Sequence, residues 1–163
     1  MAHPQVGETA PDFSLPSDGL LGGGQLTLSS LKGKPVVLYF YPKDDTSGCT
    51  KEAIAFSQLK PEFDKIGARV IGLSPDSAKK HAKFREKHEL TVDLVADEER
   101  TALEAYGVWV EKSMYGRKYM GVERTTFLID AAGRIAHVWN KVKVAGHAEE
   151  VLEAARALPP VTI

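Results

Sequence analysis

The sequence has only one cysteine, Cys49, no long apolar run and no excess of either charge. A lone cysteine excludes an internal disulfide and a zinc site made of several cysteines, so Cys49 begins as a free thiol. No apolar run approaches the roughly 20 residues needed to cross a bilayer, so we expect no membrane partner. With 21 Lys and Arg against 22 Asp and Glu, the net charge is −1, which argues against nucleic acid as a partner. The N-terminal residues lack the basic and apolar regions of a signal peptide, so the expected localisation is cytoplasmic.

Length and composition predict one globular domain, residues 1–163, because 43% of the residues are hydrophobic and 26% are charged. Two short extended pieces, residues 12–15 and 25–28, predict an N-terminal hairpin. Strand-like and helix-like segments then alternate along most of the chain. The predicted strands span residues 34–41, 68–73, 92–96, 118–120, 125–130 and 134–139, and the predicted helices span residues 49–65, 77–88, 98–106 and 146–158. This order predicts an α/β protein with a thioredoxin-like fold, in which helices flank a central mixed β-sheet.

Cys49 follows the predicted strand 34–41 after a short polar loop and lies in the first turn of the predicted helix 49–65. Open α/β sheets tend to bind their ligands at the carboxyl ends of strands. The free N–H groups and the dipole of a helix N-terminus favour a thiolate over a thiol, and the thiolate is the reactive form. The alternative is a cysteine that only packs, since free cysteines are often buried. The minimal or polar neighbours Gly48 and Thr50 favour the reactive cysteine.

Cys49 is preceded by two residues that also have a chemical interpretation, Thr46 and Pro42. Thr46 precedes it by about one helical turn, so its hydroxyl can reach the sulfur or a small polar substrate beside it. The same hydroxyl is suited to capping the helix, and the two roles are compatible. Pro42 lacks an N–H and fixes the exit of the strand, which predicts a dry wall over the sulfur.

These residues carry a resemblance to a known family. The pattern Pro42-x-x-x-Thr46-x-x-Cys49 resembles the active-site signature of the peroxiredoxins. The residues on either side of it, 39–44 and 48–52, resemble the bacterioferritin comigratory protein or peroxiredoxin Q subfamily. The resemblance extends from about residue 6 to residue 158, and its further matching segments are residues 114–116, 123–130 and 139–147.

The resemblance implies a role for each of five residues. Cys49 resembles the peroxidatic cysteine, Thr46 the hydroxyl that orients the peroxide, and Pro42 the residue that shields the sulfur. Arg124 resembles the guanidinium that holds the thiolate. Its alternative is a surface salt bridge, which its place within a strand pattern argues against. Glu52 is interpreted as an acid at the helix N-terminus that either orients Arg124 or interacts with the helix dipole.

Two features depart from the pattern of the subfamily. Ser47 stands where the subfamily usually has proline, which loosens the loop before Cys49 without removing a reacting group. A resolving cysteine is missing as well. In the subfamily it lies five residues after the peroxidatic cysteine, here Ile54, or on the following helix, here near Phe84 and Arg85. The chain therefore resembles a one-cysteine variant.

The function implied by the resemblance is a thiol-dependent peroxidase that reduces hydrogen peroxide and small organic hydroperoxides in antioxidant defence. Cys49 is expected to pass through a sulfenic acid and to be recycled by an external thiol, which is thioredoxin, glutaredoxin or glutathione. We expect no metal, haem or flavin cofactor, and a monomer or weak homodimer.

The alternative function is a redox sensor or holdase that uses Cys49 without significant turnover. Retention of Thr46 and Arg124 favours the enzyme, because only catalysis needs the leaving oxygen to be stabilised. A Cys-His hydrolase is disfavoured because no histidine is visibly paired with Cys49 in the sequence.

Other side chains with chemical potential are interpreted as structural. His81 and His88 lie on a charged predicted helix with no acidic or cysteine partner at metal-binding spacing, so we expect both on a solvated face. Trp109, Tyr115 and Tyr119 are expected to serve in packing rather than as a stacking platform.

Overall fold

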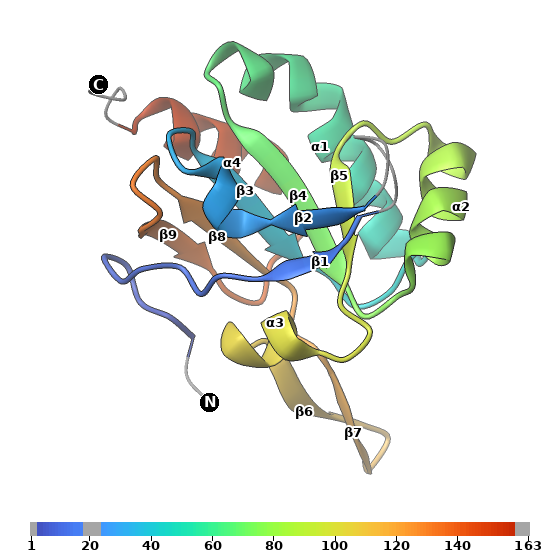
Figure 1. Ribbon diagram of the computed structural model, residues 1–163. Helices are drawn as coiled ribbons and strands as arrows, with labels where there is room; N and C mark the ends of the chain where they lie inside the picture. The colour runs from blue at the N-terminus through green and yellow to red at the C-terminus, as the bar shows by residue number, and fades with distance from the viewer. Residues whose placement is uncertain (1–2, 18–23, 159–163) are drawn as a thin grey trace.

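The computed structural model describes residues 3–17 and 24–158 and is built around a five-stranded mixed sheet (Figure 1). The strand order is β5-β4-β3-β8-β9. The first three of these strands run parallel to one another, whereas β8 and β9 are antiparallel to their neighbours. The strands are β3 (Val36–Phe40), β4 (Arg69–Ser74), β5 (Asp93–Ala96), β8 (Thr125–Ile129) and β9 (Ile135–Trp139). The mixed α/β architecture predicted from the alternation of elements is thus confirmed.

Strand β3 is buried on both of its faces, as its uninterrupted apolar sequence predicts. Val36, Leu38 and Phe40 point into the core on one side of the sheet. Val37 and Tyr39 alternate with them and point into the core on the other side. A strand of this kind must be covered by other elements on both faces.

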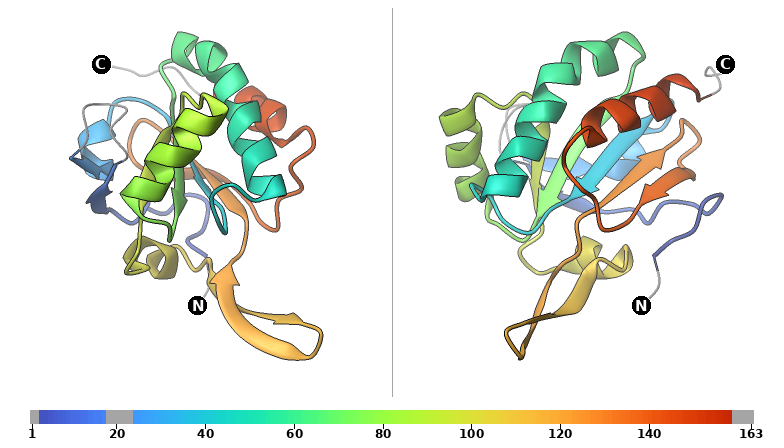
Figure 2. Two further views of the ribbon diagram at one scale, coloured as in Figure 1. Left: turned by 90° about the vertical axis from the view of Figure 1, so that its right-hand side faces the viewer. Right: turned by 180° about the vertical axis from the view of Figure 1, so that it is seen from behind.

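Three long helices cover one face of the sheet, as Figure 2 shows. They are α1 (Ser47–Lys65), α2 (Ala78–His88) and α4 (His147–Arg156). The opposite face is covered by the short helix α3 (Thr101–Ala105), the 3-10 turn η1 (Leu28–Leu31) and the hairpin of β1 (Ser14–Pro16) and β2 (Gln25–Thr27). The predicted N-terminal hairpin is confirmed, although the turn between its strands lies outside the described residues. No helix within residues 3–17 and 24–158 is long and apolar enough to span a membrane.

Helix α1 is fixed over β3 by aromatic stacking. The ring of Tyr39 stacks on Phe56 of α1 at a centroid distance of 4.8 Å and on Tyr41 at 5.6 Å. Gly72 on the neighbouring strand makes room for this ring, because a Cβ atom there would lie 2.6 Å from the Tyr39 hydroxyl and Cζ. These contacts set the position of the N-terminus of α1, where Cys49 lies.

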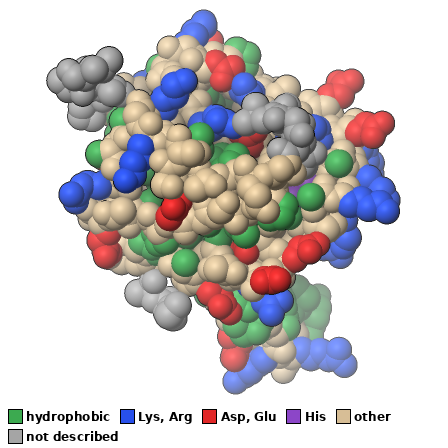
Figure 3. All heavy atoms as spheres, in the orientation of Figure 1, with side chains coloured by type: hydrophobic (Ala, Val, Ile, Leu, Met, Phe, Trp, Pro, Cys, Tyr) green, Lys and Arg blue, Asp and Glu red, His purple; other side chains and the backbone are tan. Residues whose placement is uncertain are grey.

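The sequence patterns predicted only residues 118–120 of a hairpin made of β6 (Trp109–Met114) and β7 (Arg117–Val122), which projects from the body of the molecule (Figures 1 and 3). Tyr115 occupies its turn with a φ of 53° and is 99% exposed, so the expected packing role of Tyr115 is wrong. Tyr119 is also exposed, which corrects the same expectation for that residue. Trp109 does pack, against the core and under the guanidinium of Arg100. Both faces of most of this hairpin meet solvent, so β6 lacks the apolar run used to predict strands and β7 was predicted only in its middle.

Candidate active site

The loop from Tyr41 to Thr46 leads from the carboxyl end of β3 to helix α1, which begins at Ser47. Cys49 therefore lies in the first helical turn, as predicted, and it is only 1% exposed. The N–H of Thr50 already donates to the carbonyl of Thr46 at 2.8 Å, which closes that first turn. The sulfur is thus held by regular backbone beyond the carboxyl end of the central strand β3.

Arg124, which lies outside α1, contacts the sulfur. Its Nη2 donates to Cys49 Sγ at 3.3 Å, and its Nη1 donates to Glu52 Oε1 at 2.7 Å. Arg124 lies in the connection between β7 and β8 and not inside a strand, so the strand position expected from the sequence is wrong. The connection is anchored because the carbonyl of Arg124 accepts a hydrogen bond from the N–H of Val142 at 2.9 Å. One planar guanidinium therefore bridges two side chains of α1.

Glu52 is buried beside Arg124 and is only 1% exposed. Burial raises its pKa from 4.5 to about 7, against the opposing effect of the Arg124 charge and hydrogen bond. Its second oxygen, Oε2, has no hydrogen-bond partner among the described residues. Burial alone would lower the pKa of Arg124, but the charges of Glu52 and Cys49 raise it above its usual value. The contact favours the interpretation of Glu52 as the acid that orients Arg124.

We expect Glu52 to make stability fall as the pH rises. Between pH 4.5 and about 7 the folded protein keeps a proton on Glu52 that the unfolded chain has lost, so the free energy of unfolding decreases through this window. Relative to Glu52→Gln, the wild type should lose about 3 kcal/mol over the window. Urea unfolding of both proteins below and above the window measures this difference, because other titrating groups cancel.

Glu62 on the same helix provides the control for this prediction. Its carboxylate is exposed and its pKa is lowered by Lys65, which is the opposite direction. Glu62→Gln should therefore not reproduce the effect. A wild-type to Glu52→Gln difference that is the same at both ends of the window would contradict the burial of a titrating carboxyl.

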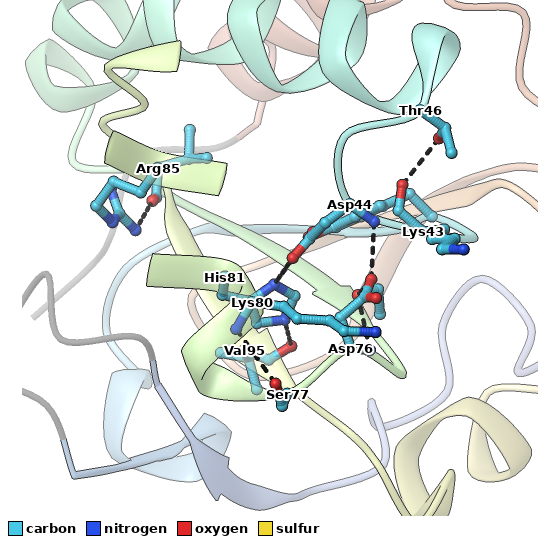
Figure 4. A network of polar contacts seen from close by, with 12 residues as sticks. Lys43, Asp44, Thr46, Asp76, Ser77, Lys80, His81, Arg85 and Val95 are labelled. Atoms are coloured by element: carbon cyan, nitrogen blue, oxygen red, sulfur yellow. Dashed lines mark hydrogen bonds and ion pairs between the residues drawn. The ribbon is translucent and has the colours of Figure 1, made fainter. Parts of the chain in front are cut away.

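Thr46 is the residue before α1, but its hydroxyl does not cap the helix. It donates instead to the carbonyl of Lys43 at 2.8 Å (Figure 4). Because this bond uses the hydroxyl proton, the lone pairs of Thr46 Oγ1 remain available to accept a bond. The side chain is exposed, and Pro42 at the start of the same loop is half-buried.

Gly48 and His147 lie near Arg124, and neither was assigned a role in the site from the sequence. A Cβ atom on Gly48 would lie 3.2 Å from Arg124 Nη2, so a larger residue would press on the guanidinium. His147 shares a 2.8 Å hydrogen bond with Thr126 and packs edge-on against Phe56. Burial and the Arg124 charge lower its pKa to about 4, so the ring is neutral near pH 7. The relation of both residues to the site depends on their closeness to Arg124, which only the fold brings about.

His81 differs most from its expected environment. It is completely buried, so the prediction of a solvated helix face is wrong for this residue. Its ring contacts Asp44 and the carbonyl of Val95. His88, on the same helix, is partly exposed and contacts Asp45. The sequence showed neither aspartate as a partner because both come from the loop after β3, about 40 residues earlier in the chain.

An open groove of about 610 Å³ leads from the projecting hairpin to Arg124. Its walls include Lys112, Tyr119 and Lys141. Within the described parts of the chain, no three His, Cys, Asp or Glu side chains are grouped so that they could hold a metal ion. The contacts of the site join a buried sulfur, a guanidinium and a carboxyl.

Comparison with known proteins relates this chain to one family. Residues 6–138 match the model of the AhpC/TSA family. Over 148 residues, or 91% of its length, the chain is 52% identical to the putative peroxiredoxin Bcp of Coxiella burnetii, 96% of which is covered. It is 47% identical over 152 residues to peroxiredoxin Bcp of Bacillus subtilis, with 93% of the chain and 95% of the relative covered.

Solved structures agree with this relationship and confirm the thioredoxin-like fold. A bacterioferritin comigratory protein of Xanthomonas campestris, studied for its alkyl peroxide reduction activity, superposes with a TM-score of 0.86 at 43% identity, covering 96% of this chain and 98% of that one. A cysteine-to-serine mutant of PrxQ from Xylella fastidiosa gives a TM-score of 0.89 at 40% identity, with the same coverage. The chain therefore belongs to the AhpC/TSA family and is a thiol-dependent peroxidase of the peroxiredoxin type.

Proposed function

We propose that Cys49 is the peroxidatic residue and that its thiolate attacks one oxygen of a peroxide. In this step an S–O bond forms and the O–O bond breaks. The sulfur loses two electrons and becomes a sulfenic acid, while the second oxygen leaves, takes up a proton and becomes water or an alcohol. Substrates of this kind are hydrogen peroxide and small organic hydroperoxides, in line with the alkyl peroxide reduction activity of the Xanthomonas relative.

The observation that carries the proposal is the bridge made by Arg124. Its Nη2 lies 3.3 Å from the sulfur, while its Nη1 is held at 2.7 Å by Glu52. A fixed positive charge at this distance stabilises the thiolate before the reaction. The same charge stabilises negative charge on the leaving oxygen, so it acts in the transition state as well.

Thr46 and Pro42 complete the proposed site. Because the Thr46 hydroxyl donates to Lys43, its oxygen is left to accept the O–H of a hydroperoxide, which orients the peroxide relative to the sulfur. Pro42 limits water at the mouth of the site. A sensor or holdase without turnover is not favoured, because a thiol that only changes oxidation state needs neither the guanidinium bridge nor a peroxide acceptor.

We further propose that an external thiol recycles the enzyme. Its thiolate attacks the Cys49 sulfenic acid and water leaves, which gives a mixed disulfide. A second thiol then releases the Cys49 thiol and carries away the disulfide. The family relationship supports a thioredoxin-type reductant, and glutaredoxin and glutathione are the other candidates. The proposed unit is one domain, residues 1–163, acting in the cytoplasm as a monomer or weak homodimer.

The missing second thiol leads to a test of this scheme. Reduced protein mixed with one equivalent of peroxide in the absence of an external thiol should consume it in forming the Cys49 sulfenic acid and should not be recycled. Excess peroxide should then carry Cys49 to the sulfinic and sulfonic acids, because no second cysteine can trap the sulfenic acid. Intact mass spectrometry should show a monomer with two or three added oxygens.

Addition of thioredoxin with its reductase and NADPH should restore turnover and prevent the added mass. A predominant disulfide dimer on a non-reducing gel would contradict the buried position of the sulfur. Continued turnover without any added thiol would contradict the recycling scheme.

A further inference from the structure

A buried pair, Asp44 and His81, joins the loop after β3 to helix α2 (Figure 4). His81 Nδ1 lies 2.7 Å from Asp44 Oδ2, and His81 Nε2 lies 2.9 Å from the carbonyl oxygen of Val95. The hydroxyl of Tyr41 donates to Asp44 Oδ1 at 2.6 Å. His81 is fully buried and Asp44 is 8% exposed, so the pair is shielded from water.

Hydrogen-bond accounting assigns the protons in this cluster. A carbonyl oxygen only accepts, so Nε2 of His81 carries a proton toward Val95. Burial and the nearby Asp44 carboxylate hold the pKa of Tyr41 well above its usual value, so the Tyr41 hydroxyl stays a donor. The remaining proton lies between His81 Nδ1 and Asp44 Oδ2, which are 2.7 Å apart. Each polar atom that joins Tyr41, Asp44 and His81 therefore has a hydrogen-bond partner.

Asp44 is also held through its backbone. Its N–H donates to Asp76 Oδ2 at 2.8 Å, and the hydroxyl of Ser74 donates to the same oxygen at 2.8 Å. Asp76 lies in the connection between β4 and α2. The loop after β3 is thus fixed at one residue from two directions, by α2 and by the segment that leads into it.

Asp44 is adjacent to the residue that accepts the hydrogen bond of the Thr46 hydroxyl. The carbonyl that receives the Thr46 hydroxyl belongs to Lys43, the residue before Asp44. Displacement of Asp44 would therefore move the Lys43 carbonyl and with it the orientation of Thr46 Oγ1. In contrast, the described contacts of Arg124 with Cys49 and Glu52 do not involve Asp44 or its partners.

We infer that Asp44 and His81 are positioning residues, which hold Thr46 in the orientation that accepts the peroxide. The inference rests on the proposed function of Cys49 and Thr46. A buried pair of an acidic and a basic side chain is a poor source of stability, because the cost of removing both groups from water offsets most of their attraction. Its directional contacts do fix geometry, and a misplacement of about 1 Å can cost roughly 100-fold in rate.

The test separates the contacts that orient Thr46 from the contacts of Arg124 with Cys49 and Glu52. His81→Leu should slow oxidation of Cys49 by hydrogen peroxide at least about tenfold, measured by stopped-flow mixing, because Asp44 loses its partner and Thr46 shifts. Alkylation of Cys49 by iodoacetamide, which needs the thiolate but not the peroxide acceptor, should stay within about twofold of wild type. Asp44→Asn keeps donors and acceptors matched with a neutral His81 and should retain most of the oxidation rate.

Lys87→Ala is the matched control. Lys87 pairs with Asp45 across the same loop and helix, but both side chains are exposed, so the expected oxidation rate is that of wild type. Should His81→Leu fail to fold, Tyr41→Phe carries the test. It deletes one oxygen that holds Asp44 and should also slow oxidation while leaving alkylation unchanged.

The inference is overturned by a wild-type oxidation rate in folded His81→Leu, or in Tyr41→Phe where it carries the test. It is equally overturned if oxidation and alkylation fall together, which is the pattern of a merely structural residue. Failure of the proposed function is a different result, in which the wild-type protein itself shows no oxidation of Cys49 by peroxide.

Discussion

Cys49→Ser is expected to reduce peroxide consumption to the level of the buffer while leaving the fold intact. The serine hydroxyl is not ionised at neutral pH and is no nucleophile toward peroxide, so the first step of the reaction is lost. The substitution is nearly isosteric in a buried position, and a serine oxygen can still accept the hydrogen bond from Arg124 Nη2. Consumption measured with excess external thiol, together with the thermal unfolding midpoint, checks both parts.

The unfolding midpoint is measured because an unfolded variant would lose activity whatever the role of Cys49 in the reaction. We expect the midpoint to shift by only a few degrees, which corresponds to about 1 kcal/mol for a chain of this size. Peroxide consumption by Cys49→Ser at a rate near that of wild type would contradict the assignment of the peroxidatic cysteine.

Residues near one another in sequence allowed much of the site to be predicted. Pro42, Thr46 and Cys49 lie within eight residues, on a loop and a helix start that the apolar pattern of β3 and α1 makes recognisable. The structure places Cys49 in the first helical turn as expected. The fold could be predicted for the same reason, since β3, β4 and α1 each carry a continuous or periodic apolar pattern.

Sequence patterns failed where an environment depends on distant residues. His81 occurs in a strongly charged helix, and only its pairing with Asp44 explains why it is fully buried. The hairpin of β6 and β7 is mostly exposed on both faces, so its side chains need not be apolar and most of it lacks the pattern that predicts a strand. The acceptor of the Thr46 hydroxyl was also not predictable, because it is a backbone carbonyl in an irregular loop.

Arg124→Met is expected to slow oxidation of Cys49 by hydrogen peroxide by roughly 10²- to 10³-fold, the range associated with the loss of one preorganised donor. Methionine retains much of the length and apolar bulk of the stem, so the space beside Gly48 stays filled. Without the guanidinium, the thiolate loses its nearest positive charge, and the pH midpoint of iodoacetamide alkylation should move upward. Stopped-flow oxidation and alkylation across a pH series measure the two effects separately.

Arg124→Met also leaves Glu52 buried without its positively charged partner. A second variant is therefore needed to separate the loss of the guanidinium from the effect of the unpaired Glu52. Arg124→Met combined with Glu52→Gln removes the buried carboxyl and should recover stability, because a carboxyl buried without its cation must take up a proton that the unfolded chain has lost at pH 7. The oxidation rate of the double variant should stay as low as that of Arg124→Met, since neither carries the guanidinium. Arg124→Lys should fall between them and wild type, because one ammonium cannot donate to Glu52 and Cys49 in the same fixed geometry. An alkylation midpoint that does not move in Arg124→Met would mean that the 3.3 Å contact contributes nothing to the thiolate.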